Sequence, residues 1–175
     1  MRITDKEVIV DFLKGVGPDH RGRLFSDTLA WTDFELEDCH DQVQWIFPLH
    51  EDSNMAKVWP VLLPETVEEA KKHPEVLANL REAKDRFEIF LGIGEHEDRM
   101  KQDRWCRDKN HNLLRITRII RSLRLFGLEA EATKFYGEVV KVAYSYDTSG
   151  KSEVSDLTLK YWHKSYNDDI WESLR

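Results

Sequence analysis

The chain has 175 residues, of which 41% are apolar and 34% are charged. Its length corresponds to one domain of ordinary size, and its six Trp, eight Phe and five Tyr exclude an intrinsically disordered chain. The formal net charge of −7 disfavours a protein whose whole surface binds polyanions.

Capping boxes predict three helices in the first part of the chain. The second helix begins after Thr32 and also carries an apolar stripe at spacings of three and four residues, which Pro48 ends. The stretches between the helices are expected to be loops, and Trp59 is expected to anchor the longer loop in the core. The predicted helices span about 4–13, 33–47 and 66–74, and the loops span 14–30 and 49–65.

Four more helices are predicted in the second part. A long helix starts at Pro74 and ends at Gly92, and a strongly amphipathic helix ends where Gly127 supplies a C-terminal cap. The valine-rich stretch 138–146 is the only strand-like piece, and we interpret it as helix. The remaining predicted helices span about 109–126, 129–144 and 153–174, with a turn at 147–150.

The pattern as a whole predicts an all-α fold, an irregular single-domain bundle of six to seven helices over residues 1–175. Residues 145–175 are expected to form a C-terminal helical extension. Two cysteines are too few for a disulfide framework, and no run approaches 18 apolar residues. The N-terminus also lacks the apolar region of a signal peptide. We therefore expect a cytoplasmic protein without a membrane segment.

Basic side chains concentrate in residues 99–124, which hold nine basic and two acidic residues, a net of +7. Its last four arginines recur every three residues from Arg115 to Arg124. Three interpretations remain open: internal pairing with the acidic residues of 33–41, capture of a small anion or acidic peptide, or binding of nucleic acid. The acidic charge of the whole chain favours the first two.

No motif specifies an enzyme, a metal site or a cofactor. Cys39, Cys106 and the histidines lack the spacing of a zinc site, and no phosphate-binding or nucleophile motif is present. Asn112 falls inside the apolar arc of its helix, so either Asn110 or Asn112 caps that helix or Asn112 points into a polar pocket. We expect no metal and no cofactor, and we favour a protein that is not an enzyme.

Two segments resemble the conserved region of the opioid growth factor receptor family. Residues 40–48, HDQVQWIFP, are similar to its H-x-x-I-Q-W-L-F-P signature. Residues 111–123, HNLLRITRIIRSL, are similar to its H-N-x-L-R-I-T-R-I-L-x-S-L signature. The order and separation of the two motifs also fit, and the resemblance covers about residues 25–140.

The resemblance implies a conserved domain standing alone, as in small microbial relatives. The vertebrate member is described as a receptor for the pentapeptide Met-enkephalin and carries long C-terminal extensions, so we do not transfer opioid binding to this chain. The motif positions with polar or amphipathic side chains become candidate site residues. They are Gln44, Trp45, His111, Asn112, Arg115, Thr117 and Arg118.

These observations support one main hypothesis and two alternatives. The main one is a binding module that recognises an acidic or carboxylate-bearing ligand, a peptide or a protein partner. Its candidate ligand-binding residues are Gln44, Trp45, His111, Asn112, Arg115 and Arg118. One alternative is an enzyme that uses His40 or His111 as a base beside Arg115 and Arg118. The other is nucleic-acid binding through residues 99–124.

Overall fold

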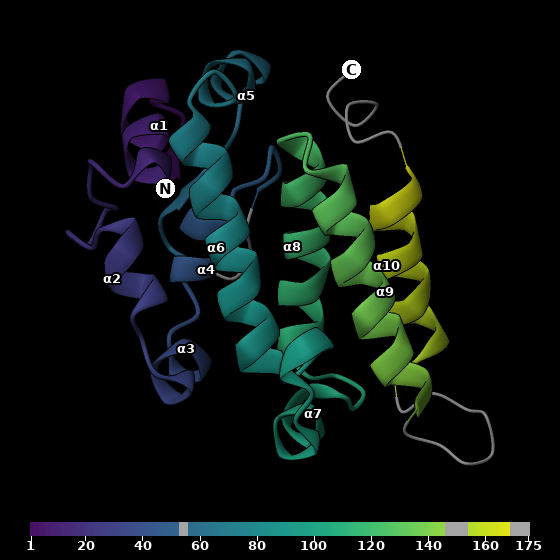
Figure 1. The fold of residues 1–175 in the computed structure, drawn as a ribbon. Helices are drawn as coiled ribbons and strands as arrows, with labels where there is room; N and C mark the ends of the chain where they lie inside the picture. The colour runs from purple at the N-terminus through teal and green to yellow at the C-terminus, as the bar shows by residue number, and fades with distance from the viewer. Residues whose placement is uncertain (53–55, 146–153, 169–175) are drawn as a thin grey trace. The chain divides into compact units, whose positions relative to one another are not determined.

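The computed structural model describes residues 1–52, 56–145 and 154–168 (Figure 1). The chain is all-α, as the sequence predicts, and the described residues form ten α-helices, more than the six or seven expected. They divide into two compact units, Met1–Ala83 and Lys84–Arg175, with the division falling inside the long helix α6 (Pro74–Leu91). Each unit is described by itself below.

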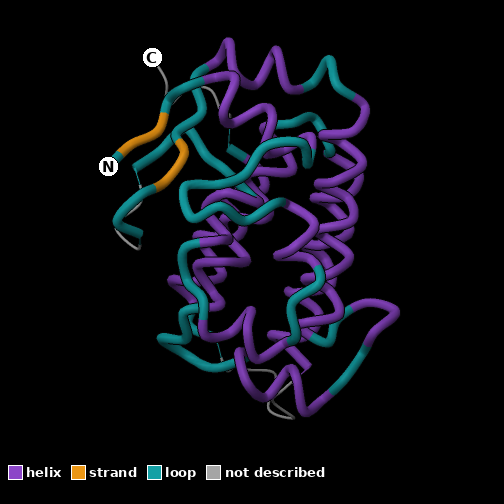
Figure 2. Tube along the Cα trace, turned by 90° about the vertical axis from the view of Figure 1, so that its left-hand side faces the viewer, coloured by secondary structure: helices purple, strands orange, loops and turns teal. Residues whose placement is uncertain are grey.

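The first unit consists of short helices and one small parallel sheet. Its helices pack through buried aromatic residues, with Phe12 meeting Phe25 and Trp45 at centroid separations of 5.5 Å and 5.2 Å. Strand β1 (Arg2–Ile3) pairs with β2 (Trp59–Pro60), both orange in Figure 2, so the 49–65 region is tied to the N-terminus. The helices are α1 (Lys6–Lys14), α2 (Phe25–Leu29), α3 (Asp33–Asp38), α4 (Gln42–Ile46) and α5 (Pro64–Ala70).

Three predictions for this unit are wrong in detail. The helix predicted over 33–47 is two helices, because the backbone of Cys39 is extended rather than helical (φ −93°, ψ 115°). The link that follows Cys39 places Asp41 in a polar network with Arg23. The loop predicted over 14–30 contains α2. The capping box assigned to Thr66 is not used, since α5 starts two residues earlier with Pro64 at its first position.

The second unit is built around three long helices. Helices α8 (Asn112–Leu125), α9 (Glu129–Ser145) and α10 (Asp156–Asn167) lie side by side in Figure 1, and α8 contacts both of the others. Fully buried Ile116, Ile120 and Phe135 come from the apolar stripes that the sequence predicts. The predicted turn at 147–150 and the end of the predicted last helix lie outside the described residues. Gly127 adopts φ 76°, and Leu128 N–H donates to Leu123 C=O, which confirms the predicted C-terminal cap of α8.

Helix α7 (Arg99–Trp105), which the sequence analysis did not predict, follows a short 3₁₀ turn at Gly94–His96. Its side chains donate to the last carbonyls of α6 and to that of the following residue, Gly92, and these carbonyls have no partner inside the helix. Gln102 Nε2 donates to Gly92 C=O at 2.7 Å, and Trp105 Nε1 donates to Leu91 C=O at 2.8 Å. Lys101 and Arg104 donate to the carbonyls of Ile89 and Phe90. Helix α7 therefore serves as a side-chain cap for α6.

Candidate functional site

Helix α8 carries three of the six candidate residues, Asn112, Arg115 and Arg118, and the first two form a buried contact. Asn112 and Arg115 are both buried, and Arg115 Nη1 donates to Asn112 Oδ1 at 3.2 Å. The Arg115 guanidinium carbon also lies 6.0 Å from the centre of the Phe90 ring. These contacts fix the orientation of Arg115 from inside the second unit.

Asn110, rather than Asn112, serves as the side-chain cap at the start of α8. Its Oδ1 accepts from Asn112 N–H at 2.9 Å, and its Nδ2 donates to Arg104 C=O at 2.8 Å. This confirms the capping interpretation made from the sequence. His111 stands at the N-cap position itself, is half-buried, and makes no side-chain cap bond.

One face of α8 reaches solvent. Leu114 is 58% exposed, and Arg118 and Arg121, four and seven residues further on, are partly exposed. At about 100° per residue these three side chains share one face of the helix. This partly exposed face therefore carries two guanidinium groups beside an apolar side chain.

Several basic side chains of residues 99–124 donate hydrogen bonds to carbonyls at the C-terminal ends of helices. Lys101 and Arg104 bind carbonyls at the end of α6, as described above. Arg124 Nη1 donates to the carbonyls of Ser165 and Asp168 at the end of α10, both at 2.9 Å. Cations at helix C-termini are favoured by the partial negative charge there. These side chains thus have a structural role that the interpretations made from the sequence did not include.

Gln44 and Trp45 lie together in α4 of the first unit and are both buried. The Trp45 ring stacks on His20 with a centroid distance of 5.7 Å, and Gln44 Nε2 donates to His40 C=O at 3.4 Å. Within the described residues, Trp45 Nε1 and Gln44 Oε1 have no hydrogen-bond partner. Trp45 is therefore part of the core of the first unit, and its indole N–H donates to no described residue.

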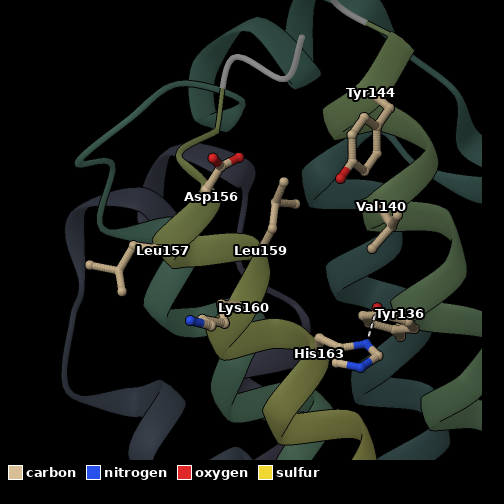
Figure 3. Close-up of a pocket in the computed structure, with 8 residues that line it drawn as sticks. All are labelled: Tyr136, Val140, Tyr144, Asp156, Leu157, Leu159, Lys160 and His163. Carbon is tan, nitrogen blue, oxygen red and sulfur yellow. Dashed lines mark hydrogen bonds between the residues drawn. The ribbon is translucent and has the colours of Figure 1, made fainter. Parts of the chain in front are cut away.

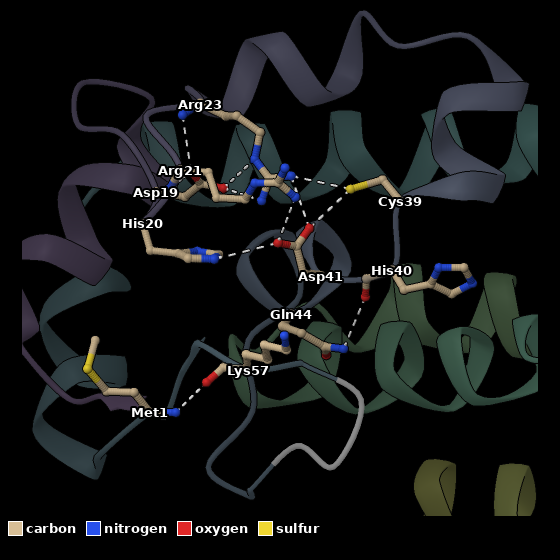
Figure 4. A network of polar contacts seen from close by, with 10 residues as sticks. All are labelled: Met1, Asp19, His20, Arg21, Arg23, Cys39, His40, Asp41, Gln44 and Lys57. Atoms are coloured by element: carbon tan, nitrogen blue, oxygen red, sulfur yellow. Dashed lines mark hydrogen bonds and ion pairs between the residues drawn. The ribbon is translucent and has the colours of Figure 1, made fainter.

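A polar network joins the loop after α1 to the link between α3 and α4 (Figure 4). Asp41 accepts hydrogen bonds from Arg23 at 3.0 Å, from Arg21 at 3.3 Å and from the Cys39 thiol at 3.1 Å. Arg23 also pairs with Asp19, whose side chain is almost fully buried, at 2.6 Å. Asp41, the last acidic residue of the 33–41 segment, therefore pairs with Arg21 and Arg23 of the same unit.

Electrostatics in this network stabilise the charged form of Asp41. Burial acts to raise its pKa, but the hydrogen bonds from Cys39 and Arg23 and the charge of Arg23 outweigh burial and lower the pKa from 3.8 to about 2. Burial and the neighbouring Asp41 raise the pKa of the Cys39 thiol. Cys39 is therefore held as a neutral thiol that donates to Asp41, which disfavours a reactive thiolate.

The histidines of the enzyme hypothesis lie in different units. His40 is exposed between α3 and α4 of the first unit, and His111 is at the start of α8 in the second. Within the described parts of the chain, no group of three or more His, Cys, Asp or Glu side chains is arranged to hold a metal ion. No helix there is both long enough and apolar enough to cross a membrane.

Comparisons with known proteins agree on one family. The family model described as the opioid growth factor receptor (OGFr) conserved region matches residues 25–169. The chain belongs to this family. It is 35% identical to the rat opioid growth factor receptor over 142 residues, 36% identical to the human protein over 124 residues, and 36% identical to the mouse protein over 141 residues. No solved structure matches it.

The match covers much of this OGFr-family chain but little of its relatives. It spans 70%, 62% and 70% of this chain and only 24%, 18% and 22% of the rat, human and mouse proteins. The matched region includes both signature motifs and all six candidate residues. Within it the structure brings Gln44 next to Trp45 and Asn112 next to Arg115, and it places Arg118 one turn along from Arg115.

Proposed function

We propose that this OGFr-family domain is a binding module that takes an acidic or carboxylate-bearing ligand, such as a peptide terminus, on the exposed face of α8. The observation that carries the proposal is the partly exposed pair Arg118 and Arg121 beside exposed Leu114. Guanidinium groups suit planar, bidentate binding of a carboxylate. The leucine offers an apolar contact to the body of the same ligand.

The buried neighbours support the rigidity that such a site needs. Arg115 is fixed by Asn112 and Phe90, and Asn110 caps the helix, so α8 presents Arg118 from a firmly packed element. The relatives are named receptors, which implies a bound ligand for them, and we extend a binding role to this chain. The ligand-binding roles predicted for His111, Gln44 and Trp45 stay predictions, and Gln44 and Trp45 are buried in α4 of the first unit.

The test is a direct binding measurement with simple acidic probes. Succinate and a peptide of four glutamates are titrated into the protein by calorimetry and by thermal shift. We expect saturable binding that weakens by about tenfold in Arg118→Gln and in Arg121→Gln, which corresponds to about 1.4 kcal/mol for each lost charged contact. Arg99→Gln, which removes an exposed arginine from α7, is the matched control and leaves affinity unchanged.

Three results would contradict the proposal. The first is no binding of either acidic probe. The second is a fall in melting temperature on the order of 10 °C in Arg118→Gln, which identifies a structural arginine, since losing one partner of a buried pair costs about 3–5 kcal/mol. The third is tighter binding of duplex DNA that falls steeply with salt, which favours the nucleic-acid hypothesis instead.

A further inference from the structure

The second unit has a groove between α9 and α10, and none of its lining residues belongs to the signature motifs (Figure 3). Its volume of about 590 Å³ is in the usual range for small-molecule sites, which often lie between helices. Tyr136, Val140 and Tyr144 line it from successive turns of α9, and Leu159 faces them from α10. The groove therefore has an apolar and aromatic lining.

One wall of the groove is held rigid. The Tyr136 ring stacks on Tyr166 with a centroid distance of 4.6 Å and an angle of 6°, and its hydroxyl lies 3.3 Å from His163 Nδ1. Asn167 Nδ2 lies 3.1 Å from the same nitrogen of His163. These contacts occupy the polar edges of Tyr136 and His163, so they shape the groove rather than offer charge to a ligand.

Charge at the groove comes from two side chains of α10. Asp156 and Lys160 are both exposed and are four residues apart, about 5–6 Å between Cβ atoms. Neither forms an ion pair with a described residue. In Figure 3 the Lys160 side chain points away from α9, and its flexible four-carbon stem lets the ammonium turn toward the groove. The groove thus offers one negative and one positive group next to an apolar surface.

We propose that this groove binds the zwitterion of a free amino acid with a large apolar side chain. The ammonium of the ligand pairs with Asp156, its carboxylate pairs with Lys160, and its side chain packs on Val140 and Leu159. Tyr144, which is 51% exposed, covers the outer end of the bound side chain. Asp156 and Lys160, one helical turn apart, suit a small molecule that carries both a positive and a negative charge. The apolar lining of the groove favours a ligand with an apolar side chain.

The test uses L-phenylalanine and two analogues that each lack one charge. Phenethylamine lacks the carboxylate, and 3-phenylpropionate lacks the ammonium. Binding is followed by the change in amide NMR signals of α9 and α10. We expect saturable binding of phenylalanine and at least tenfold weaker binding of both analogues. Equal binding of all three molecules, or no saturation by phenylalanine at about 10 mM, overturns the proposal.

Variants at the groove locate the site. Asp156→Asn and Lys160→Gln change exposed side chains and are expected to weaken phenylalanine binding by about tenfold each. Asp38→Asn and Lys134→Gln remove the same charges elsewhere and are expected to leave binding unchanged. Val140→Arg, which fills the groove, is expected to abolish it. Affinity that is the same in Asp156→Asn and Lys160→Gln as in the wild type overturns the proposal.

This site is independent of the proposed function at α8. Arg118→Gln is expected to bind phenylalanine with unchanged affinity while losing affinity for the acidic probes. Asp156→Asn is expected to do the reverse. The two proposals therefore fail separately, because each has its own probe and its own variant.

Discussion

Asp41 joins two segments of the first unit through a single carboxylate. It accepts hydrogen bonds from Arg21 and Arg23 in the loop after α1 and from Cys39 at the end of α3. Hydrogen bonds to a charged group contribute about 1.5–3 kcal/mol, more than bonds between neutral groups. Since the Asp41 side chain is 20% exposed, its ion pairs are less screened than those at the surface.

We predict that Asp41→Asn destabilises the protein at pH 7 by about 1.5–3 kcal/mol, because the amide keeps one acceptor and loses the charge. For a chain of this length the melting temperature is expected to fall by roughly 3–12 °C. Asp38→Asn, which changes an exposed carboxylate at the end of α3, is the control and is expected to change stability by less than about 0.5 kcal/mol. Urea unfolding of both variants measures the difference.

The effect of Asp41→Asn depends on pH with a definite sign. The folded-state pKa of Asp41 is lowered from 3.8 to about 2, so its stabilising effect is fully present above the unfolded pKa and is lost as pH falls toward 2. The stability difference between wild type and variant is therefore expected to shrink between about pH 5 and pH 2. A difference that stays constant over this window contradicts the assigned role of the carboxylate.

At the level of elements, the junction between α6 and α7 depends on a glycine. Gly92 adopts φ 66°, and a Cβ atom placed there would lie 2.7 Å from Asp98 C=O and 2.8 Å from Lys101 Cβ. This close approach lets the α7 side chains reach the carbonyls at the end of α6. A substitution at Gly92 therefore adds a steric clash with backbone to the cost of a left-handed conformation.

We predict that Gly92→Ala destabilises the protein by at least about 3 kcal/mol, since the left-handed conformation alone costs an alanine about 1–2 kcal/mol. Gly22→Ala is a matched control, because Gly22 has a similar φ of 79° and no atom within 4 Å of the added Cβ. The control is expected to show only the conformational cost. Equal losses in the two variants, measured by chemical denaturation, would refute the close approach of α7 to α6.

The elements that the sequence predicts well are those whose stability comes from their own apolar stripe. The stripes and the Gly127 cap place the end of α8 and both ends of α9 within one residue, while α8 starts three residues later than predicted. Helix α7 lacks such a stripe, and its buried Gln102 and Trp105 act by binding carbonyls of α6, which no local pattern reveals. The break between α3 and α4 likewise depends on Arg23, which is distant in sequence.

In the candidate sites too, contacts within one helix can be predicted from the sequence, whereas contacts between helices cannot. The contact between Asn112 and Arg115 spans three residues of one helix, and the exposed face with Arg118 follows from the same periodicity, so both are accessible from spacing. The groove at Asp156 and Lys160 requires the alignment of α9 against α10. Spacing within either helix does not indicate that alignment. Asp156 and Lys160 were therefore not predicted as site residues from the sequence.

At the scale of the whole molecule, α6 belongs to both compact units. Its first part, to Ala83, lies in the first unit and its last part, from Lys84, in the second. Buried side chains occur on both sides of the division, with Leu80 in the first unit and Phe87 in the second. A helix that supplies the cores of both units cannot unfold in one unit without losing turns that continue into the other, because helix formation is cooperative.

We therefore predict that the two units unfold in one transition. Hydrogen exchange under increasing urea measures this, since the most protected amides of α1 and α4 report on the first unit and those of α8 and α9 on the second. The protection of both sets is expected to converge on one free energy with one dependence on urea. Two distinct free energies, with α6 exchanging in two separate parts, would mean that each unit is stable without the other and that the helix is only a connection between them.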